Sequence, residues 1–198
     1  MISLYSGTPG SGKSLHIASK LYHWTRCRNE LIIVNFKVNE DVLGKKGKLI
    51  QIDDELIDVA FLNWLSEWWH KTHKFKEGGI TLIIDEAQLR FNSRDWCAAG
   101  RAEWLSFFAQ HRHLGYDVIL IAQFDRMLDR QIRSLLEYEY KHRRISNFGW
   151  RGKLISLFAG GKLFSCVKMW YPLKERIGCD FFAFRKKYGR VYDTHQKF

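Results

Sequence analysis

The chain has 198 residues, of which 46% are hydrophobic and 27% charged, and its formal net charge is +11. This length and composition predict one domain, or one domain with a small appendage, and argue against a disordered chain. No run of about 20 apolar residues is present, so no transmembrane segment is predicted. Met1 leads directly into an apolar, strand-like segment, which argues against a signal peptide.

Strands and helices are expected to alternate along most of the chain. Short apolar runs predict buried strands, and longer segments with apolar residues at helical spacing predict helices. The predicted strands are residues 2–6, 31–34, 48–52, 80–84, 117–123 and 138–145, and the predicted helices are residues 13–27, 54–75, 100–113 and 126–136. This alternation predicts an α/β fold with three αβα layers and a mostly parallel sheet.

The C-terminal part of the chain differs in charge. Residues 1–125 carry 15 basic and 15 acidic side chains, whereas residues 126–198 carry 17 basic and 6 acidic ones. We therefore divide the chain into a core at 1–146 and a small basic appendage at 147–198. The basic excess predicts an anionic partner, either nucleic acid or the inner face of a membrane, although an ordinary solvated surface would have the same composition.

A hairpin is predicted inside the appendage. Two strand-like segments, 153–159 and 162–171, flank the pair Gly160-Gly161. Two glycines between such segments favour a tight two-residue turn.

A phosphate-binding loop is predicted between the first strand and the first helix. Residues 7–14 read Gly-Thr-Pro-Gly-Ser-Gly-Lys-Ser, which is the spacing of a P-loop. The glycines let successive backbone N–H groups face a phosphate, and the helix N-terminus adds positive charge. The side chain of Lys13 can reach the β- and γ-phosphates, and the Ser14 hydroxyl can ligate Mg²⁺. The predicted ATP-binding residues are Gly7, Thr8, Pro9, Gly10, Ser11, Gly12, Lys13, Ser14 and Leu15.

Two adjacent acids follow the predicted strand at 80–84. Asp85 and Glu86 lie where ligands bind in open α/β sheets, at the carboxyl end of a strand. Asp85 is predicted to hold Mg²⁺, directly or through a water molecule. Glu86 is predicted to orient and deprotonate the attacking water. Either acid could also serve only as a helix cap or turn residue.

Two further polar residues are candidates for sensing and stabilising the γ-phosphate. Gln123 ends a predicted strand and would face that phosphate if the strand lies between those at 2–6 and 80–84. Arg112 is the candidate arginine donated to a neighbouring subunit, with Arg94 and Arg133 as rivals. The dipole of a helix also favours basic residues in its last turn, so Arg112 has a purely structural explanation as well.

The predicted helix at 54–75 has a wide apolar face. It includes Trp64, Trp68 and Trp69, and its polar residues form one narrow stripe. We expect this face to be buried in the core or covered by a neighbouring subunit, while base stacking on the tryptophans remains an alternative.

Several segments together resemble the Zot family, named for zonula occludens toxin, which includes the gene I assembly ATPases of filamentous phages. The matching segments are residues 7–14, 82–88, 91–96, 111–117, 122–123, 128–133 and 192–196, and their order is the same. The stretches at 91–96 and 111–117 make the resemblance specific, since nucleotide motifs alone are shared by many families.

The resemblance implies an Mg²⁺-dependent ATPase motor on the cytoplasmic face of the host inner membrane. Such a motor is expected to form a homo-oligomeric ring, to contact phage coat and assembly proteins, and to drive export of single-stranded phage DNA. Family members usually continue into a transmembrane helix, so membrane attachment is expected through a segment outside this chain.

Two other functions remain open. A nucleotide-gated assembly scaffold would bind ATP with little turnover. A nucleoside kinase would share the P-loop and the segment Asp85–Gln88, but thymidine kinases carry paired zinc cysteines. The four cysteines here form no CxxC pair, which argues against a zinc ribbon and favours a reducing cytosol.

Overall fold

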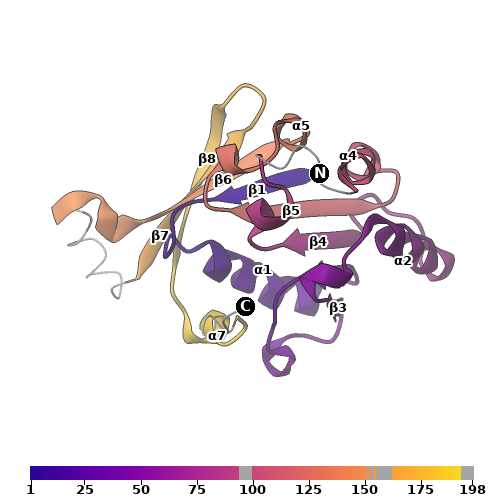
Figure 1. Ribbon diagram of the computed structural model, residues 1–198. Coiled ribbons are helices and arrows are strands. Elements are labelled where there is room, and N and C mark those ends of the chain that lie inside the picture. The colour runs from indigo at the N-terminus through magenta and orange to yellow at the C-terminus, as the bar shows by residue number, and fades with distance from the viewer. Residues whose placement is uncertain (94–99, 151, 153, 155–161, 193–198) are drawn as a thin grey trace.

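A single mixed β-sheet forms the centre of the molecule (Figure 1). The computed structural model describes residues 1–93, 100–150, 152, 154 and 162–192. The strand order is β3-β2-β4-β5-β1-β6-β7-β8, and every pairing from β3 to β6 is parallel, whereas β6–β7 and β7–β8 are antiparallel. The bounds are β1 Ile2–Ser6, β2 Leu31–Val34, β3 Lys48–Gln51, β4 Ile80–Ile84, β5 Tyr116–Ala122, β6 Tyr138–Arg144, β7 Leu163–Trp170 and β8 Glu175–Ala183. The predicted three-layer fold is confirmed, and β5 lies between β1 and β4 as the argument for Gln123 required.

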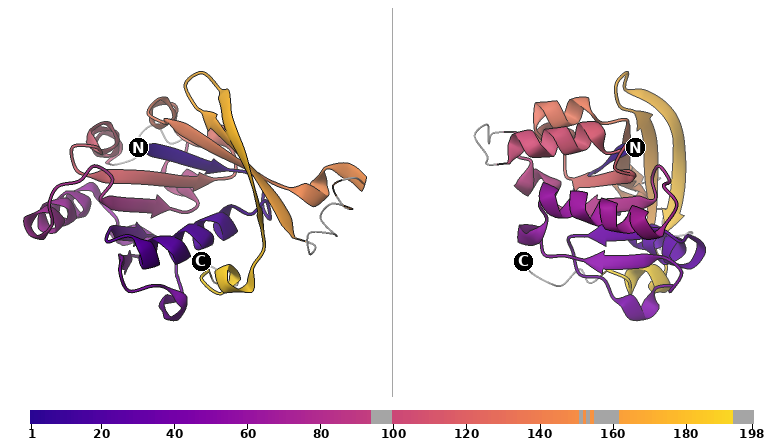
Figure 2. Two further views of the ribbon diagram at one scale, coloured as in Figure 1. Left: turned by 180° about the vertical axis from the view of Figure 1, so that it is seen from behind. Right: turned by 90° about the vertical axis from the view of Figure 1, so that its right-hand side faces the viewer.

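Helices cover both faces of this sheet (Figures 1 and 2). Helices α1 and α7 lie on one face, and α2, α4 and α5 lie on the other. Their bounds are α1 Lys13–Cys27, α2 Val59–Thr72, α3 Ala87–Arg90, α4 Arg101–Gln110, α5 Arg130–Ser134 and α7 Lys186–Gly189. No helix within the described ranges combines the length and the hydropathy that crossing a bilayer requires.

Alternation along the central strands divides the core into two clusters. On β4, Leu82 and Ile84 pack with the cluster under α2 and α4, whereas Ile83 packs with the cluster under α1. All five residues of β4 are buried. A parallel strand covered on both faces is therefore encoded as a continuous apolar run, which is the pattern that identified it in the sequence.

The hairpin predicted inside the appendage is wrong in its pairing. Strand β7 pairs with β8 in antiparallel fashion, and the two are joined by a turn at residues 171–174. Leu154, in the predicted first arm, is helical, and the proposed turn at Gly160-Gly161 lies outside the described residues. The turn that forms contains Lys174 at φ 55°, a conformation for which glycine is the usual sequence signal.

The basic C-terminal segment continues the core sheet. Seven residue pairs join β6 to β7, from Tyr138↔Trp170 to Arg144↔Phe164. The division of the chain at 146/147 remains a prediction.

Helix α2 starts later than predicted. The sequence placed its start near residue 54, but the helix begins at Val59, because the Asp58 side chain accepts a hydrogen bond from the Phe61 backbone N–H at 2.6 Å. Residues Asp54–Leu56 form a separate turn of 3₁₀-helix. Trp69 is buried in the core, whereas Trp64 and Trp68 are 57% and 40% exposed.

Candidate functional site

The P-loop connects β1 to α1 in the conformation that its glycines allow. Gly7, Gly10 and Gly12 all have positive φ, at 146°, 74° and 96°. At Gly7 an added Cβ would lie 2.6 Å from the His142 carbonyl oxygen, and at Gly12 it would lie 2.7 Å from the Phe164 ring. Glycine at these two positions is thus required by space as well as by φ.

The lysine and serines of the loop lie at the start of α1. The Lys13 ammonium donates to the Gly7 carbonyl oxygen at 2.6 Å and to that of Thr8 at 3.4 Å. The Ser11 hydroxyl is buried and has no hydrogen-bond partner among the described residues. No acidic residue occupies the first turn of α1, so the positive end of the helix dipole is left available to an anion. Leu15, on α1, is half-buried and packs against the core cluster under that helix.

The paired acids occupy the carboxyl end of β4, next to the loop. The Asp85 backbone N–H donates to Asn35 Oδ1 at 2.6 Å, and Asn35 Nδ2 donates to the Asp85 carbonyl oxygen at 3.1 Å. One carboxylate oxygen of Asp85 accepts the Glu86 N–H at 2.8 Å, and the other accepts the hydroxyl of Tyr192. The orientation of Asp85 is therefore fixed from both its backbone and its side chain.

Glu86 has an unusual backbone. It lies in the left-handed region at φ 48°, where non-glycine residues are uncommon, and it is the residue that precedes α3. Its carboxylate accepts a hydrogen bond from Gln88 Nε2.

These groups line one cavity of about 1100 Å³. The P-loop and the paired acids both contribute residues to it, and so does Gln123, at the carboxyl end of β5. Its lining includes Pro9, Gly10, Lys13, Ser14, Asn35, Asp85, Glu86, Gln123 and Tyr192. The sequence had predicted the joint placement of Lys13, Ser14, Asp85, Glu86 and Gln123, and the structure brings all five to this cavity.

The charges in the cavity influence one another. Burial lowers the pKa of the Lys13 ammonium, and the nearby carboxylates of Asp85 and Glu86 oppose this shift. Burial raises the pKa of Asp85, whereas the hydrogen bonds from Tyr192 and from the Glu86 amide oppose the rise. A phosphate and a cation brought between these groups would each find an opposite charge.

Sequence reasoning missed the two residues of the cavity that hydrogen-bond to Asp85, Asn35 and Tyr192. Asn35 directly follows the apolar run of β2, so the rule that identified Asp85 at a strand's carboxyl end would have found it as well. Tyr192 lies 107 positions from Asp85 in the sequence. It begins the segment 192–196 that resembles the Zot family, but nothing in that segment indicates the contact with Asp85.

Two of the three candidate arginines, Arg112 and Arg133, do not line this cavity. Arg112 lies at the opposite edge of the sheet, next to the N-termini of β1 and β6, and it forms salt bridges with Glu137 at 2.7 Å and with Glu77 at 3.5 Å. Arg133 is on α5, and its Nε is buried without a hydrogen-bond partner among the described residues. Arg94 lies outside those residues. The role of Arg112 in a neighbouring subunit stays a prediction.

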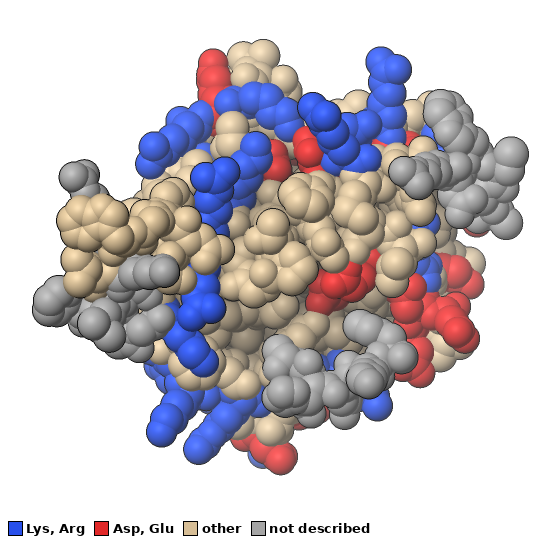
Figure 3. All heavy atoms as spheres, turned by 60° about the vertical axis from the view of Figure 1, so that its left-hand side comes forward, with Lys and Arg blue, Asp and Glu red and all other residues tan. Residues whose placement is uncertain are grey.

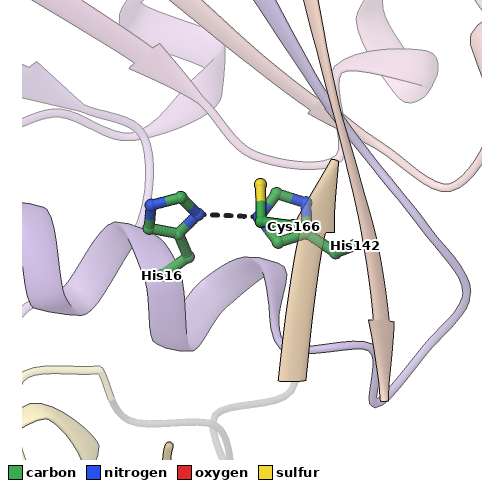
Figure 4. Close-up of side chains that lie close together, drawn as sticks. All are labelled: His16, His142 and Cys166. Carbon is green, nitrogen blue, oxygen red and sulfur yellow. Dashed lines mark hydrogen bonds between the residues drawn. The ribbon is translucent and has the colours of Figure 1, made fainter. Parts of the chain in front are cut away.

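A histidine pair lies between α1 and β6, with His142 buried and His16 half-buried (Figure 4). His16 Nδ1 on α1 and His142 Nε2 on β6 are 2.8 Å apart, and Cys166 on β7 lies beside them. Burial lowers the pKa of His16 to about 3 and that of His142 to about 4. The other ring nitrogen of His142 lies 3.3 Å from the Ser6 carbonyl oxygen. With both nitrogens of His142 engaged, the arrangement is a neutral hydrogen-bonded link between α1 and β6.

Comparison with known proteins agrees with this geometry. A sequence model described as Zonular occludens toxin (Zot) matches residues 1–171. The Gene 1 protein of Enterobacteria phage I2-2 is 38% identical over 169 residues, a stretch that covers 82% of this chain and 46% of the relative. The chain thus spans about half the length of this curated relative.

Two solved structures share the fold. The N-terminal domain of zonular occludens toxin from Neisseria meningitidis superposes with a TM-score of 0.59 and 20% identity, covering 97% of this chain and 98% of the other. The genome packaging NTPase B204 from Sulfolobus turreted icosahedral virus 2, in complex with ATP-gammaS, gives 0.53 and 20%, covering 91% and 95%. At these identities the likeness establishes the P-loop NTPase fold. The family's sequence model matches residues 1–171, which is most of this chain, and the chain therefore belongs to the zonular occludens toxin (Zot) family.

Proposed function

We propose that this chain is the ATP-hydrolysing motor domain of a filamentous-phage assembly machine that exports single-stranded phage DNA. The observation that carries the proposal is the meeting of the P-loop with Asp85 and Glu86 in one cavity. Membership of the Zot family, and the relative named Gene 1 protein in a phage, support the biological setting.

The residues of the cavity suit a magnesium nucleotide. The Ser11 hydroxyl, which no described residue bonds, would be satisfied by a phosphate oxygen in the loop. Ser14 and Asp85 offer hydroxyl and carboxylate oxygens, the donors that Mg²⁺ prefers, and they would hold it. Bound there, Mg²⁺ would neutralise charge developing on the β- and γ-phosphate oxygens.

The remaining groups would carry out the hydrolytic step. Lys13 would transfer its hydrogen bonds from the loop carbonyls to the β- and γ-phosphates. Glu86 would orient a water molecule toward the γ-phosphorus and accept its proton, and the Gln123 amide would report whether the γ-phosphate is present. Arg112 would act on a neighbouring subunit's nucleotide after leaving its salt bridge with Glu137.

An oligomeric ring is supported by the exposed face of α2. Trp64 and Trp68 lie four residues apart on this helix, with 57% and 40% of their surface exposed. Large apolar side chains gathered in this way are typical of a surface that another subunit covers.

The basic C-terminal strands support a nucleic-acid partner. Figure 3 shows Lys and Arg side chains along the upper rim and the left of one face, with Asp and Glu gathered at the right. Exposed aromatic rings also lie on the C-terminal strands, including Phe181 on β8 at 66% and Trp170 on β7 at 40%. Cations that contact phosphates and rings that stack on bases are the two elements of single-strand binding. The exposed basic residues of this region include Lys162, Lys174, Arg176, Arg185, Lys186, Lys187 and Arg190.

We further propose that the domain works at the cytoplasmic face of the host inner membrane, attached through a segment outside this chain. Phage coat and assembly proteins would be its other partners. The family resemblance supports these assignments, and the shared fold with a genome packaging NTPase is consistent with a motor.

The central test compares nucleotide binding with turnover. We expect the wild-type chain to bind ATP in calorimetry with Mg²⁺ and to release phosphate at steady state, faster when single-stranded DNA is added. Glu86→Gln should retain ATP binding and lose at least about 100-fold in turnover, because the general base is removed. Glu103→Gln, an exposed change on α4, is the matched control.

The alternatives give different results in the same assays. Tight ATP binding without phosphate release, at every DNA concentration tried, would identify a scaffold. Transfer of the γ-phosphate to an added nucleoside would identify a kinase. Normal turnover by the Glu86 variant would show that the assignment of the base is wrong.

A further inference from the structure

Tyr192 enters the nucleotide cavity from the end of the described chain. Its hydroxyl donates to Asp85 Oδ2 and also interacts with the Ser14 side chain. Ser14 and Asp85 are the two residues that would hold Mg²⁺. One phenol thus contacts both.

The backbone around Tyr192 is anchored. The Asn39 N–H donates to the Val191 carbonyl oxygen at 3.0 Å, and Val38 and Tyr192 form an antiparallel bridge. Val191 is fully buried, and the Tyr192 ring packs on Phe36 with a centroid separation of 4.9 Å. The hydroxyl is therefore held in the cavity by an anchored segment, residues Tyr188–Tyr192, which we call the strap.

We propose that Tyr192 is a positioning residue for the metal site of this domain. Its hydroxyl bond holds the Asp85 carboxylate in one rotamer, with Oδ1 turned to the Glu86 amide and Oδ2 turned to the Tyr192 hydroxyl. The inference rests on the proposed function, and it names a residue that the P-loop and the paired acids do not reveal.

The physical reason is that a carboxylate is a good ligand only when it is already aimed at the cation. Asp85 is buried, so an unanchored carboxylate would have few polar groups to hold it in place. Outer-shell hydrogen bonds that orient a ligand change metal affinity by about 10- to 100-fold when they are removed. Removing the phenolic oxygen while keeping the ring should therefore weaken metal binding and leave the strap in place.

The test is Tyr192→Phe in the 198-residue chain, with Mn²⁺ as a spectroscopic substitute for Mg²⁺. The free Mn²⁺ signal in electron paramagnetic resonance is followed during titration at saturating AMPPNP. We expect the dissociation constant for Mn²⁺ to rise about tenfold or more. Affinity for AMPPNP in EDTA should stay within about twofold of wild type, because the P-loop contacts that would bind the nucleotide are unchanged.

Tyr188→Phe is the matched control. Its hydroxyl lies 2.9 Å from His23 Nε2 on α1, so the variant removes a phenolic hydrogen bond from the same C-terminal segment without touching Asp85. We expect it to bind Mn²⁺ like the wild type. Thermal melts of both variants verify that the strap remains folded.

Three results would overturn the proposal. Unchanged Mn²⁺ affinity in Tyr192→Phe would show that the hydroxyl does not position Asp85. Tighter Mn²⁺ binding would show that the phenol competes with the metal. Equal losses in both variants would assign the effect to docking of the strap. Failure of the wild type to bind AMPPNP, with or without Mn²⁺, would instead refute the proposed function and this inference with it.

Discussion

The sheet consists of two regions that are built by different rules. From β1 to β5 the strands are parallel and accompanied by balanced charge, and all but the edge strand β3 are buried on both faces. Their carboxyl ends hold the nucleotide cavity. From β6 to β8 the sheet becomes antiparallel, and β8 is largely exposed and strongly basic nearby. The buried region thus holds the candidate nucleotide site, and the anionic partner that we propose would contact the exposed region.

The largest effect is expected from a substitution in the P-loop, and it should lower ATP affinity. Lys13→Ala removes the ammonium that would bind the β- and γ-phosphates, and we expect ATP affinity measured by calorimetry to fall by about 100-fold or more, since charge-assisted bonds to phosphate are among the strong ones. Lys45→Ala, an exposed lysine, is the control. Retained ATP binding together with retained binding to single-stranded DNA would mean that Lys13 is not a phosphate ligand.

The second prediction tests the link between the two regions. His142 on β6 bonds His16 on α1 and has a folded pKa of about 4, below its ordinary value of about 6.5. The unfolded chain binds more protons than the folded chain between these pH values. The contribution of neutral His142 to the free energy of unfolding is therefore complete above pH 6.5 and declines as the pH falls toward 4. By pH 4.5 it should be smaller by roughly 2 kcal/mol.

Melting temperatures between pH 7.5 and 4.5 provide the measurement. In His142→Gln the decrease on acidification should be shallower than in the wild type. His113→Gln, at an exposed position, should keep the wild-type slope. Identical slopes in all three proteins would exclude the histidine pair as the source.

The third prediction concerns the basic region. Combined Lys162→Ala and Arg176→Ala should weaken binding to an oligo-dT strand by about tenfold at low salt, with a shallower salt dependence, because each lost phosphate contact removes a released counterion. ATP affinity should not change. Lys71→Ala with Lys74→Ala on the α2 side alters net charge equally, so an equal loss in that variant would indicate a general charge effect.

The smallest effect is expected on the free energy of unfolding, from a substitution that removes the N-terminal cap of α2. Asp58→Ala removes the cap of α2 and should lower the free energy of unfolding by about 1 kcal/mol in urea titrations. Asp53→Ala is matched to it, because Asp53 precedes a 3₁₀ turn without making a capping bond. If both variants lose the same stability, the cap bond does not define the start of α2.

The buried region was the more predictable of the two. A parallel strand covered on both faces must be an apolar run, so β2, β4 and β5 were visible in the sequence, and rules for strand ends then placed Asp85, Glu86 and Gln123. The basic region has half-exposed strands with no comparable constraint. Its turn ends in Lys174 at positive φ rather than glycine, and the pairing was therefore predicted wrongly.

The site was only partly predictable for a related reason. Local motifs specify the groups that one strand or loop delivers, but Tyr192 reaches Asp85 through tertiary structure, across 107 positions. The position of Arg112 relative to a nucleotide depends on a second subunit, and intrachain patterns do not encode that distance.

The left-handed backbone at Glu86 has an evolutionary consequence. An L-residue there forfeits about 1–2 kcal/mol, and asparagine tolerates the conformation better. Glu86→Asn would thus relieve the backbone while deleting the carboxylate. Selection for thermal stability alone would therefore favour replacement of Glu86, with loss of its carboxylate. Retention of glutamate at this position would be evidence of selection for turnover.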